Sequence, residues 1–247
     1  MPWQLFCTAA ALAASSLAAP PVSADLLPTE PGVHRLQLET DGLELRFSAE
    51  IPAGEASGPR PLVLALHYGF DRSRPFPPYY GQVFLERVAA PGLRELGAYV
   101  VAPDSHGMGW NDPQIESSVL ALLDRLVADP RVDSDRVIVT GYSMGGAGAW
   151  YFAAEHTDRF VAAVPMAGRL RGEWIQGVGS LPVHILHSRR DELIDHDAAR
   201  ALVDAADKET ITFTTLSGIT HFESPRYAEP LAEVIVPWLR RTLASKD

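Results

Sequence analysis

The sequence predicts an α/β fold, in which a mostly parallel central sheet carries helices on both of its faces. From about residue 61 to the C-terminus, short apolar runs alternate with longer amphipathic segments, the pattern of βαβ units. Ahead of them stand two segments of alternating polarity, Val33–Glu39 and Leu43–Glu50, around an Asp-Gly pair. Asp-Gly between such segments is typical of a hairpin, so we expect an antiparallel pair at the N-terminal edge of the sheet.

Six apolar runs have the composition of strands buried on both faces of a sheet. They are Pro61–His67, Ala98–Ala102, Arg136–Gly141, Phe160–Ala167, Pro182–His187 and Ile211–Leu216. Helical patterns lie between and after them, at Val83–Leu96, Glu116–Ala128, Met144–Glu155, Asp197–Ala206 and Ala228–Leu243. In the second of these, apolar residues recur so as to form one face, which predicts a helix packed on the sheet.

Residues 1–24 have the pattern of an export signal. Leu5–Leu17 is apolar or small throughout, and the compact residues Val22, Ser23 and Ala24 precede Asp25. The run is shorter than the roughly 20 apolar residues of a membrane span, so we expect no stable membrane anchor. We therefore expect cleavage after residue 24, a single domain over residues 25–247, and a secreted or periplasmic protein.

The net charge of the chain indicates which classes of partner it can bind. The formal net charge is −10, with lysines and arginines scattered along the chain. An acidic surface repels nucleic acid, so nucleic-acid binding is not expected. The single cysteine, Cys7, lies in the predicted export signal, so no disulfide framework is expected either. The oligomeric state stays open.

The strongest chemical motif is Gly-Tyr-Ser-Met-Gly at residues 141–145, placed where a predicted buried strand meets a predicted helix. A tight strand-to-helix turn forces its central residue into a strained conformation and makes its side chain project. Ser143 is therefore the predicted nucleophile. The alternative, a glycine-rich turn that binds phosphate, would need its glycines in another order near the first strand.

The segments GYSMGGAGAW and HTDRFVAAVPMAG resemble the α/β-hydrolase superfamily. The resemblance is to its small branch of carboxylesterases, phospholipase/thioesterase-like enzymes, secreted feruloyl esterases and polyhydroxybutyrate depolymerases. It extends from Pro61 to the C-terminus and implies the α/β-hydrolase fold, with the catalytic residues in the order Ser, acid, His. Members usually carry His-Gly-Gly or His-Gly-x after the third strand, whereas this chain has His67-Tyr68-Gly69.

A base and an acid should follow Ser143 in the chain. Of the later histidines, His221 stands in the loop between the last predicted strand and the last helix, where the superfamily carries its histidine. Asp191 follows the strand Pro182–His187, in a loop like the one that carries the superfamily's aspartate. Three other carboxylates are close enough to be rivals of Asp191: Glu192, Asp195 and Asp197.

An oxyanion hole in this superfamily uses two backbone N–H groups. Met144, the residue after the nucleophile, should supply one. Tyr68 or Gly69 should supply the other, with Tyr68 favoured, and Gly69 is also expected at the substrate. Trp110, after the fourth strand, is expected either to contact the substrate or to be buried in the core.

A metal site is not expected, and neither is a cofactor. His184, His187 and His196 are the candidates for metal binding, but residues three apart on one strand cannot both face one ion. The predicted function is a serine hydrolase that cleaves small-molecule or polymer-borne carboxylic esters through an acyl-Ser143 intermediate. The alternatives are a thioesterase or peptidase on the same fold, or a non-catalytic binding protein on a hydrolase scaffold.

Overall fold

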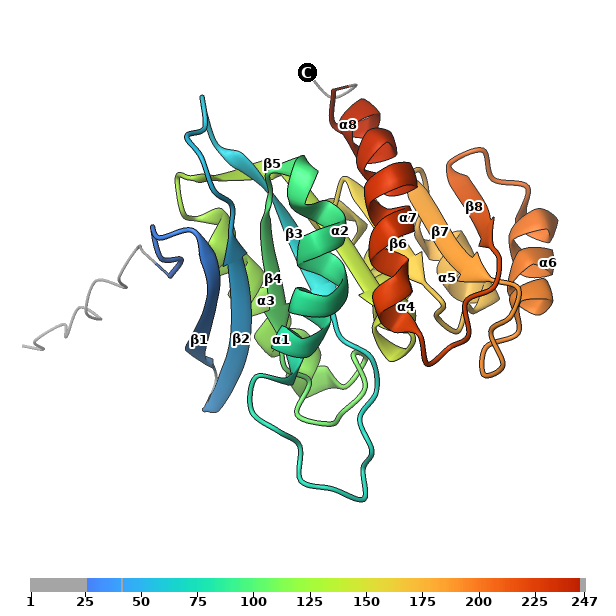
Figure 1. The fold of residues 1–247 in the computed structure, drawn as a ribbon, viewed down its shortest axis with the longest axis horizontal. Coiled ribbons are helices and arrows are strands. Elements are labelled where there is room, and N and C mark those ends of the chain that lie inside the picture. Colours follow the sequence, from blue (N-terminus) through green and yellow to red (C-terminus); the bar gives the residue numbers. More distant parts are fainter. Residues whose placement is uncertain (1–25, 41, 245–247) are drawn as a thin grey trace, which may run out of the picture.

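The computed structural model describes residues 26–40 and 42–244 and has one eight-stranded sheet (Figure 1). The strand order is β1-β2-β4-β3-β5-β6-β7-β8. The strands are β1 (Gly32–Thr40), β2 (Leu43–Ile51), β3 (Arg60–Leu66), β4 (Tyr99–Pro103), β5 (Val132–Tyr142), β6 (Ala162–Met166), β7 (Val183–Ser188) and β8 (Ile211–Leu216). The predicted export signal lies outside the described residues.

The sheet is parallel from β4 to β8, and the antiparallel hairpin β1–β2 joins its β4 edge. Since the carboxyl ends of parallel strands lie at one edge of the sheet, the loops after β3, β5, β7 and β8 gather there. These loops carry Tyr68, Ser143, Asp191 and His221, so the topology brings four distant parts of the chain together.

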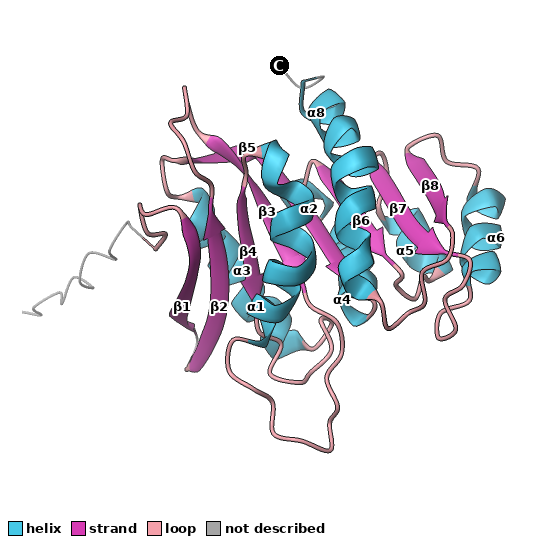
Figure 2. Ribbon diagram, viewed as in Figure 1, coloured by secondary structure: helices cyan, strands magenta, loops and turns pink. Residues whose placement is uncertain are grey.

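Helices cover both faces of the sheet, as Figure 2 shows. One face carries α1 (Tyr80–Phe84) and α2 (Ala90–Leu93), joined by a π-helical segment, together with α7 (Ala228–Pro230) and α8 (Val236–Ala244). The opposite face carries α3 (Pro113–Val127), α4 (Met144–Glu155), α5 (Gly172–Gly177) and α6 (His196–Ala206). No helix in the described part of the chain is both long and apolar enough to cross a bilayer.

Two hydrophobic layers hold these helices to the sheet. Along β3, Val63 and Ala65 pack with the layer that contains α2 and α8, whereas Leu62 and Leu64 pack with the layer that contains α3 and α4. Successive strand residues point to opposite faces, so a strand with helices on both sides must be apolar at every position. This is why the parallel strands appear in the sequence as continuous apolar runs.

Strand β5 and helix α5 differ from the sequence prediction. Strand β5 begins at Val132, four residues before the apolar run, because Val132 pairs with Arg60 beyond an irregularity in the ladder. The intervening residues are polar, so no apolar pattern marks this extension. Helix α5 was not predicted, because its six residues are too few to show a helical period.

Candidate active site

Ser143 lies at the turn between β5 and α4, with a backbone φ of 56° and ψ of −113°. A non-glycine residue at positive φ is strained, and the surroundings must hold it there. Its N–H donates to the Met166 carbonyl at 3.0 Å, and its own carbonyl accepts from the Ala147 N–H at 3.0 Å. A Cβ atom at Gly145 would lie 1.9 Å from the Leu66 carbonyl oxygen, so only glycine fits there.

A continuous line of hydrogen bonds starts at the Ser143 side chain. Ser143 Oγ lies 2.7 Å from His221 Nε2, and His221 Nδ1 lies 2.8 Å from Asp191 Oδ2. The other carboxylate oxygen of Asp191 accepts the N–H groups of Leu193 and Ile194, at 3.0 and 2.8 Å. Because the carboxylate is an acceptor, Nδ1 of His221 carries the ring proton, and Nε2 is left to accept from the serine hydroxyl.

The rival carboxylates have other partners. Glu192 accepts the main-chain N–H of His221 at 2.9 Å, not its ring nitrogen. Asp195 caps α6 by accepting the Ala198 N–H, and Asp197 pairs with the ring of His196. Among these carboxylates, Asp191 is therefore the one that contacts the ring of His221.

Two buried side chains that sequence reasoning did not assign to the site hold this arrangement. The Tyr142 hydroxyl donates to the His221 carbonyl at 2.8 Å, and Tyr142 is 1% exposed. His187 Nε2 lies 3.0 Å from the Ile194 carbonyl and 3.4 Å from Asp191 Oδ2, and burial lowers the pKa of His187. The only sequence cue was position, since Tyr142 precedes the serine and His187 stands four residues before the aspartate.

Backbone N–H groups of Met144 and Tyr68 are available near Ser143. Met144 is the first residue of α4, where an N–H has no acceptor within the helix. The Tyr68 N–H has no hydrogen-bond partner among the described residues. Gly69 adjoins Met144, because a Cβ at Gly69 would lie 3.9 Å from that of Met144.

The loop that contains Tyr68 is held by the ring of His67. Nδ1 of this ring donates to the Tyr68 carbonyl at 2.7 Å, and Nε2 accepts the Ser105 N–H at 3.1 Å. The backbone donor at Nε2 requires the neutral tautomer with its proton on Nδ1. Complete burial supports this, since it lowers the pKa of His67 to about 4.

Trp110 is buried in the core, at 2% exposed, which corresponds to the second of the two alternatives that the sequence left open. Its indole N–H donates to the His67 carbonyl at 3.0 Å. A Cβ at Gly148 would lie 2.7 Å from the indole, so this glycine makes room for it. Because N–H and C=O of a trans peptide point in opposite directions, Trp110 fixes the direction of the Tyr68 N–H.

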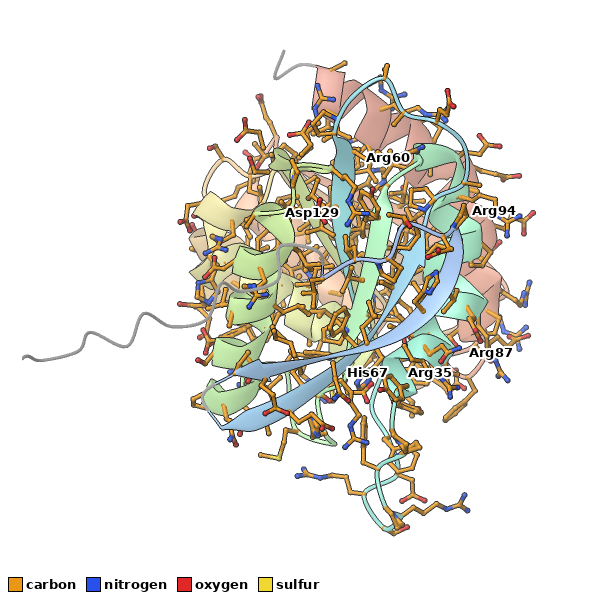
Figure 3. The ribbon with its side chains drawn as sticks, turned by 90° about the vertical axis from the view of Figure 1, so that its left-hand side faces the viewer. Arg35, Arg60, His67, Arg87, Arg94 and Asp129 are labelled. Carbon is orange, nitrogen blue, oxygen red and sulfur yellow. The ribbon has the colours of Figure 1, made fainter. Side chains whose placement is uncertain are left out.

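The long loop between β3 and α1 closes over His67, which lies at the end of the sheet from which this loop extends (Figure 3). The rings of Phe76 and Tyr80 lie 5.7 and 5.0 Å from the His67 ring. The end of the loop is tied to Asp104, whose carboxylate accepts the N–H groups of Tyr79 and Gly81 at 2.7 and 2.8 Å. Burial raises the pKa of Asp104 to about 6.

Ser143 and His221 open onto a cavity of about 480 Å³. Tyr68 and Gly69 line it, whereas Trp110 does not. The remaining walls include Leu193 and Phe222, with 55% and 76% of their surface exposed. The cavity is therefore partly apolar and open to solvent.

The three histidines considered for metal binding have separate partners. His184 and His196 share hydrogen bonds with the hydroxyls of Thr214 and Thr215, at 2.8 and 2.9 Å, and His187 bonds to a carbonyl. No cluster of three or more His, Cys, Asp or Glu side chains in the described ranges is arranged to hold a metal ion.

The fold and the sequence are both similar to those of known hydrolases. The chain is similar in structure to FphF, a fluorophosphonate-binding serine hydrolase of Staphylococcus aureus, with a TM-score of 0.67 and 14% identity over 87% of this chain and 99% of that one. The model of the dienelactone hydrolase family matches residues 105–222, which include Ser143, Asp191 and His221. The chain has the α/β-hydrolase fold.

Two curated relatives match a part of this chain. Dipeptidyl-peptidase 5 of Porphyromonas gingivalis is 32% identical over 88 residues, which are 31% of this chain and 13% of the peptidase. A putative esterase, NocK of Nocardia uniformis, is 35% identical over 79 residues, which are 31% of this chain and 23% of the esterase. The match thus spans less than a quarter of either relative's length.

Proposed function

We propose that this α/β hydrolase cleaves carboxylic esters through an acyl-Ser143 intermediate. The observation that carries the proposal is the unbroken line of hydrogen bonds from Ser143 through His221 to Asp191, at the mouth of a cavity. A serine hydroxyl is a weak nucleophile until a base accepts its proton, and the base needs a third group to hold its tautomer. In this chain Ser143 is the nucleophile, His221 is the base and Asp191 is the group that holds the base.

The reaction has two halves. Nε2 of His221 takes the proton of Ser143 as Oγ attacks the ester carbonyl, and then gives that proton to the departing alcohol as the carbon–oxygen bond breaks. A water molecule then attacks the acyl-serine, with His221 again as base, and releases the acid. Asp191 stabilises the imidazolium that forms and stays ionised.

We assign the oxyanion hole to the backbone N–H groups of Met144 and Tyr68. Both lack a partner within the described structure, and both belong to backbone held in a fixed direction, by α4 and by the Trp110 and His67 bonds. Fixed donors aimed at the developing charge lower the barrier because they need no reorganisation during the reaction.

Thioesters and peptides are the competing substrates, because the same residues would transfer an acyl group from sulfur or nitrogen. One relative bears the name of an esterase and another that of a dipeptidyl peptidase. The same catalytic residues serve all three reactions, so they do not distinguish an ester substrate from a thioester or a peptide. A binding protein on the same scaffold would keep the fold without turnover.

The test is labelling of the purified protein with a fluorophosphonate, together with turnover of p-nitrophenyl butyrate, its thioester analogue and the corresponding anilide. We expect labelling and ester turnover in the wild type and neither in Ser143→Ala. A faster reaction with the thioester or the anilide would replace the ester assignment. A folded wild type that neither labels nor turns over any of the three would favour the binding scaffold.

We also propose that the enzyme is exported and loses residues 1–24. The support is the apolar run Leu5–Leu17 followed by compact residues before Asp25. Mass measurement of the protein recovered from outside an expressing bacterial cell should give a chain that begins at Asp25. A full-length chain found only inside the cell would contradict this.

A further inference from the structure

A second hollow adjoins the catalytic cavity, and the side chain of Leu193 lines both. It measures about 290 Å³ and lies between the loop after β6 and the start of α6. We call it the Leu193 groove. Six of its eight lining residues are apolar, namely Leu170, Leu193, Ile194, Ala198, Ala199 and Leu202.

Exposed apolar side chains gather at these two hollows. Over the described ranges, the large apolar residues with the most exposed surface are Met108, Leu193, Leu202 and Phe222. Three of these four line the catalytic cavity or the Leu193 groove. Isolated exposed apolar residues are ordinary, but a contiguous group beside a cavity is typical of a ligand site.

The wall between the two hollows is tied to the candidate catalytic acid. The N–H groups of Leu193 and Ile194 both donate to Asp191 Oδ1, at 3.0 and 2.8 Å. Leu193 is therefore held at a fixed position relative to the line of hydrogen bonds that ends at Ser143. Two charged residues, Arg169 and Asp195, also line the groove. The carboxylate of Asp195 already accepts a hydrogen bond from the Ala198 N–H, as the cap of α6.

We propose that the Leu193 groove is a subsite for an unbranched alkyl chain of the ester substrate. The inference rests on the proposed ester hydrolysis and adds its substrate class: an ester whose acyl or alcohol part carries a chain that passes Leu193. Apolar burial contributes about 0.8 kcal/mol per methylene, which corresponds to about a fourfold gain in kcat/KM for each methylene that enters the groove.

The experiment measures kcat/KM for p-nitrophenyl acetate, butyrate, hexanoate and octanoate, and for methyl to hexyl acetates, in three proteins. The first is the wild type. The second is Ala198→Trp, which fills the groove from an exposed position on α6. The third is Ala201→Trp, the same change at an exposed position on the same helix, outside the groove.

We expect wild-type kcat/KM to rise with chain length in one of the two ester series, which identifies the acyl or the alcohol part as the occupant. Ala198→Trp should keep wild-type activity on p-nitrophenyl acetate within about twofold and lose about tenfold or more on the longest preferred chain. Ala201→Trp should follow the wild type.

A flat wild-type profile in both series, or Ala198→Trp that keeps the long-chain gain, would overturn the subsite while leaving ester hydrolysis standing. Equal losses on short and long chains in Ala198→Trp would also overturn it, since they would indicate general damage. Absence of turnover and of fluorophosphonate labelling in the wild type would overturn the proposed function, and the subsite with it.

Discussion

The hydroxyl of Tyr142 donates a 2.8 Å hydrogen bond to the main-chain carbonyl of His221. Tyr142 precedes the candidate nucleophile at the end of β5, whereas His221 comes from a loop 79 residues later. The bond therefore ties the turn that carries Ser143 directly to the loop that carries His221. Within the same two segments, Ser143 Oγ lies 2.7 Å from His221 Nε2.

Tyr142→Phe should lower kcat about tenfold and the free energy of unfolding by about 1 kcal/mol. The ring still fills its place in the core, but the His221 carbonyl loses its donor, and a small displacement of the base is costly in rate. Ester turnover and urea unfolding check both values. Tyr151→Phe is the matched control, since it loses a hydroxyl bond to Glu116, away from Ser143, and should keep kcat.

Replacement of His67 by Phe should lower kcat about tenfold or more and change KM by less than threefold. The phenyl ring can occupy the aromatic site of the imidazole, but the Tyr68 carbonyl and the Ser105 N–H lose their partner. Loss of order at the proposed oxyanion donors should affect the transition state more than the bound ester. A change confined to KM would contradict the positioning role of His67.

His67 should also affect how the free energy of unfolding changes with pH. Its pKa is lowered from about 6.5 to about 4 in the folded protein, so the unfolded chain binds the proton more tightly. The contribution of the neutral ring to the free energy of unfolding is complete above about pH 6.5. It is lost as the pH falls towards 4, by up to ~3 kcal/mol.

Asp104 acts in the opposite direction. Burial raises the pKa of Asp104 from its ordinary value to about 6, so the folded protein binds this proton more tightly than the unfolded chain. The resulting contribution of Asp104 to the free energy of unfolding is present at low pH and is lost as the pH rises towards 6. The measurement is therefore the difference in free energy of unfolding between the wild type and His67→Phe from pH 4 to pH 7. The wild type should gain stability relative to the variant as the pH rises. A constant difference would contradict the buried neutral ring.

Gly145→Ala should abolish folding or destabilise the protein by more than ~3 kcal/mol. The added Cβ would lie 1.9 Å from the Leu66 carbonyl oxygen, so β3 and α4 would have to separate. Gly172→Ala is the matched control, because a Cβ there meets nothing within 4 Å. Thermal unfolding of both variants decides the matter; similar melting temperatures would contradict the close packing at this turn.

His187 should matter through Asp191. His187→Leu removes the N–H that bonds to the Ile194 carbonyl beside the carboxylate, and we expect kcat to fall about tenfold. His187→Gln keeps an N–H donor and should restore kcat to within about threefold of wild type. If both variants lose activity equally, His187 contributes packing alone.

The sequence allowed the parallel sheet and the meeting of Ser143, Asp191 and His221 to be predicted. Continuous apolar runs have few other interpretations, and the order of the strands decides which loops meet. Trp110 shows the limit of such reasoning. Its residue type suits a pocket wall and a core equally, and only the packing against Gly148 and the bond to His67 decide between them.

The supporting bonds of Tyr142 and His187 were also out of reach of sequence reasoning. Each joins residues through a specific side-chain direction, and neither direction leaves a pattern of polarity along the chain. The short helix α5 was missed for a related reason, since six residues make less than two helical turns.

The position of a covalent adduct identifies the nucleophile directly. The wild-type protein is inactivated with a fluorophosphonate, digested and sequenced by tandem mass spectrometry. We expect one phosphonyl group per chain, on Ser143, and unlabelled Ser143→Ala with no ester turnover. An adduct on another residue, or ester turnover that persists in Ser143→Ala, would contradict Ser143 as the nucleophile.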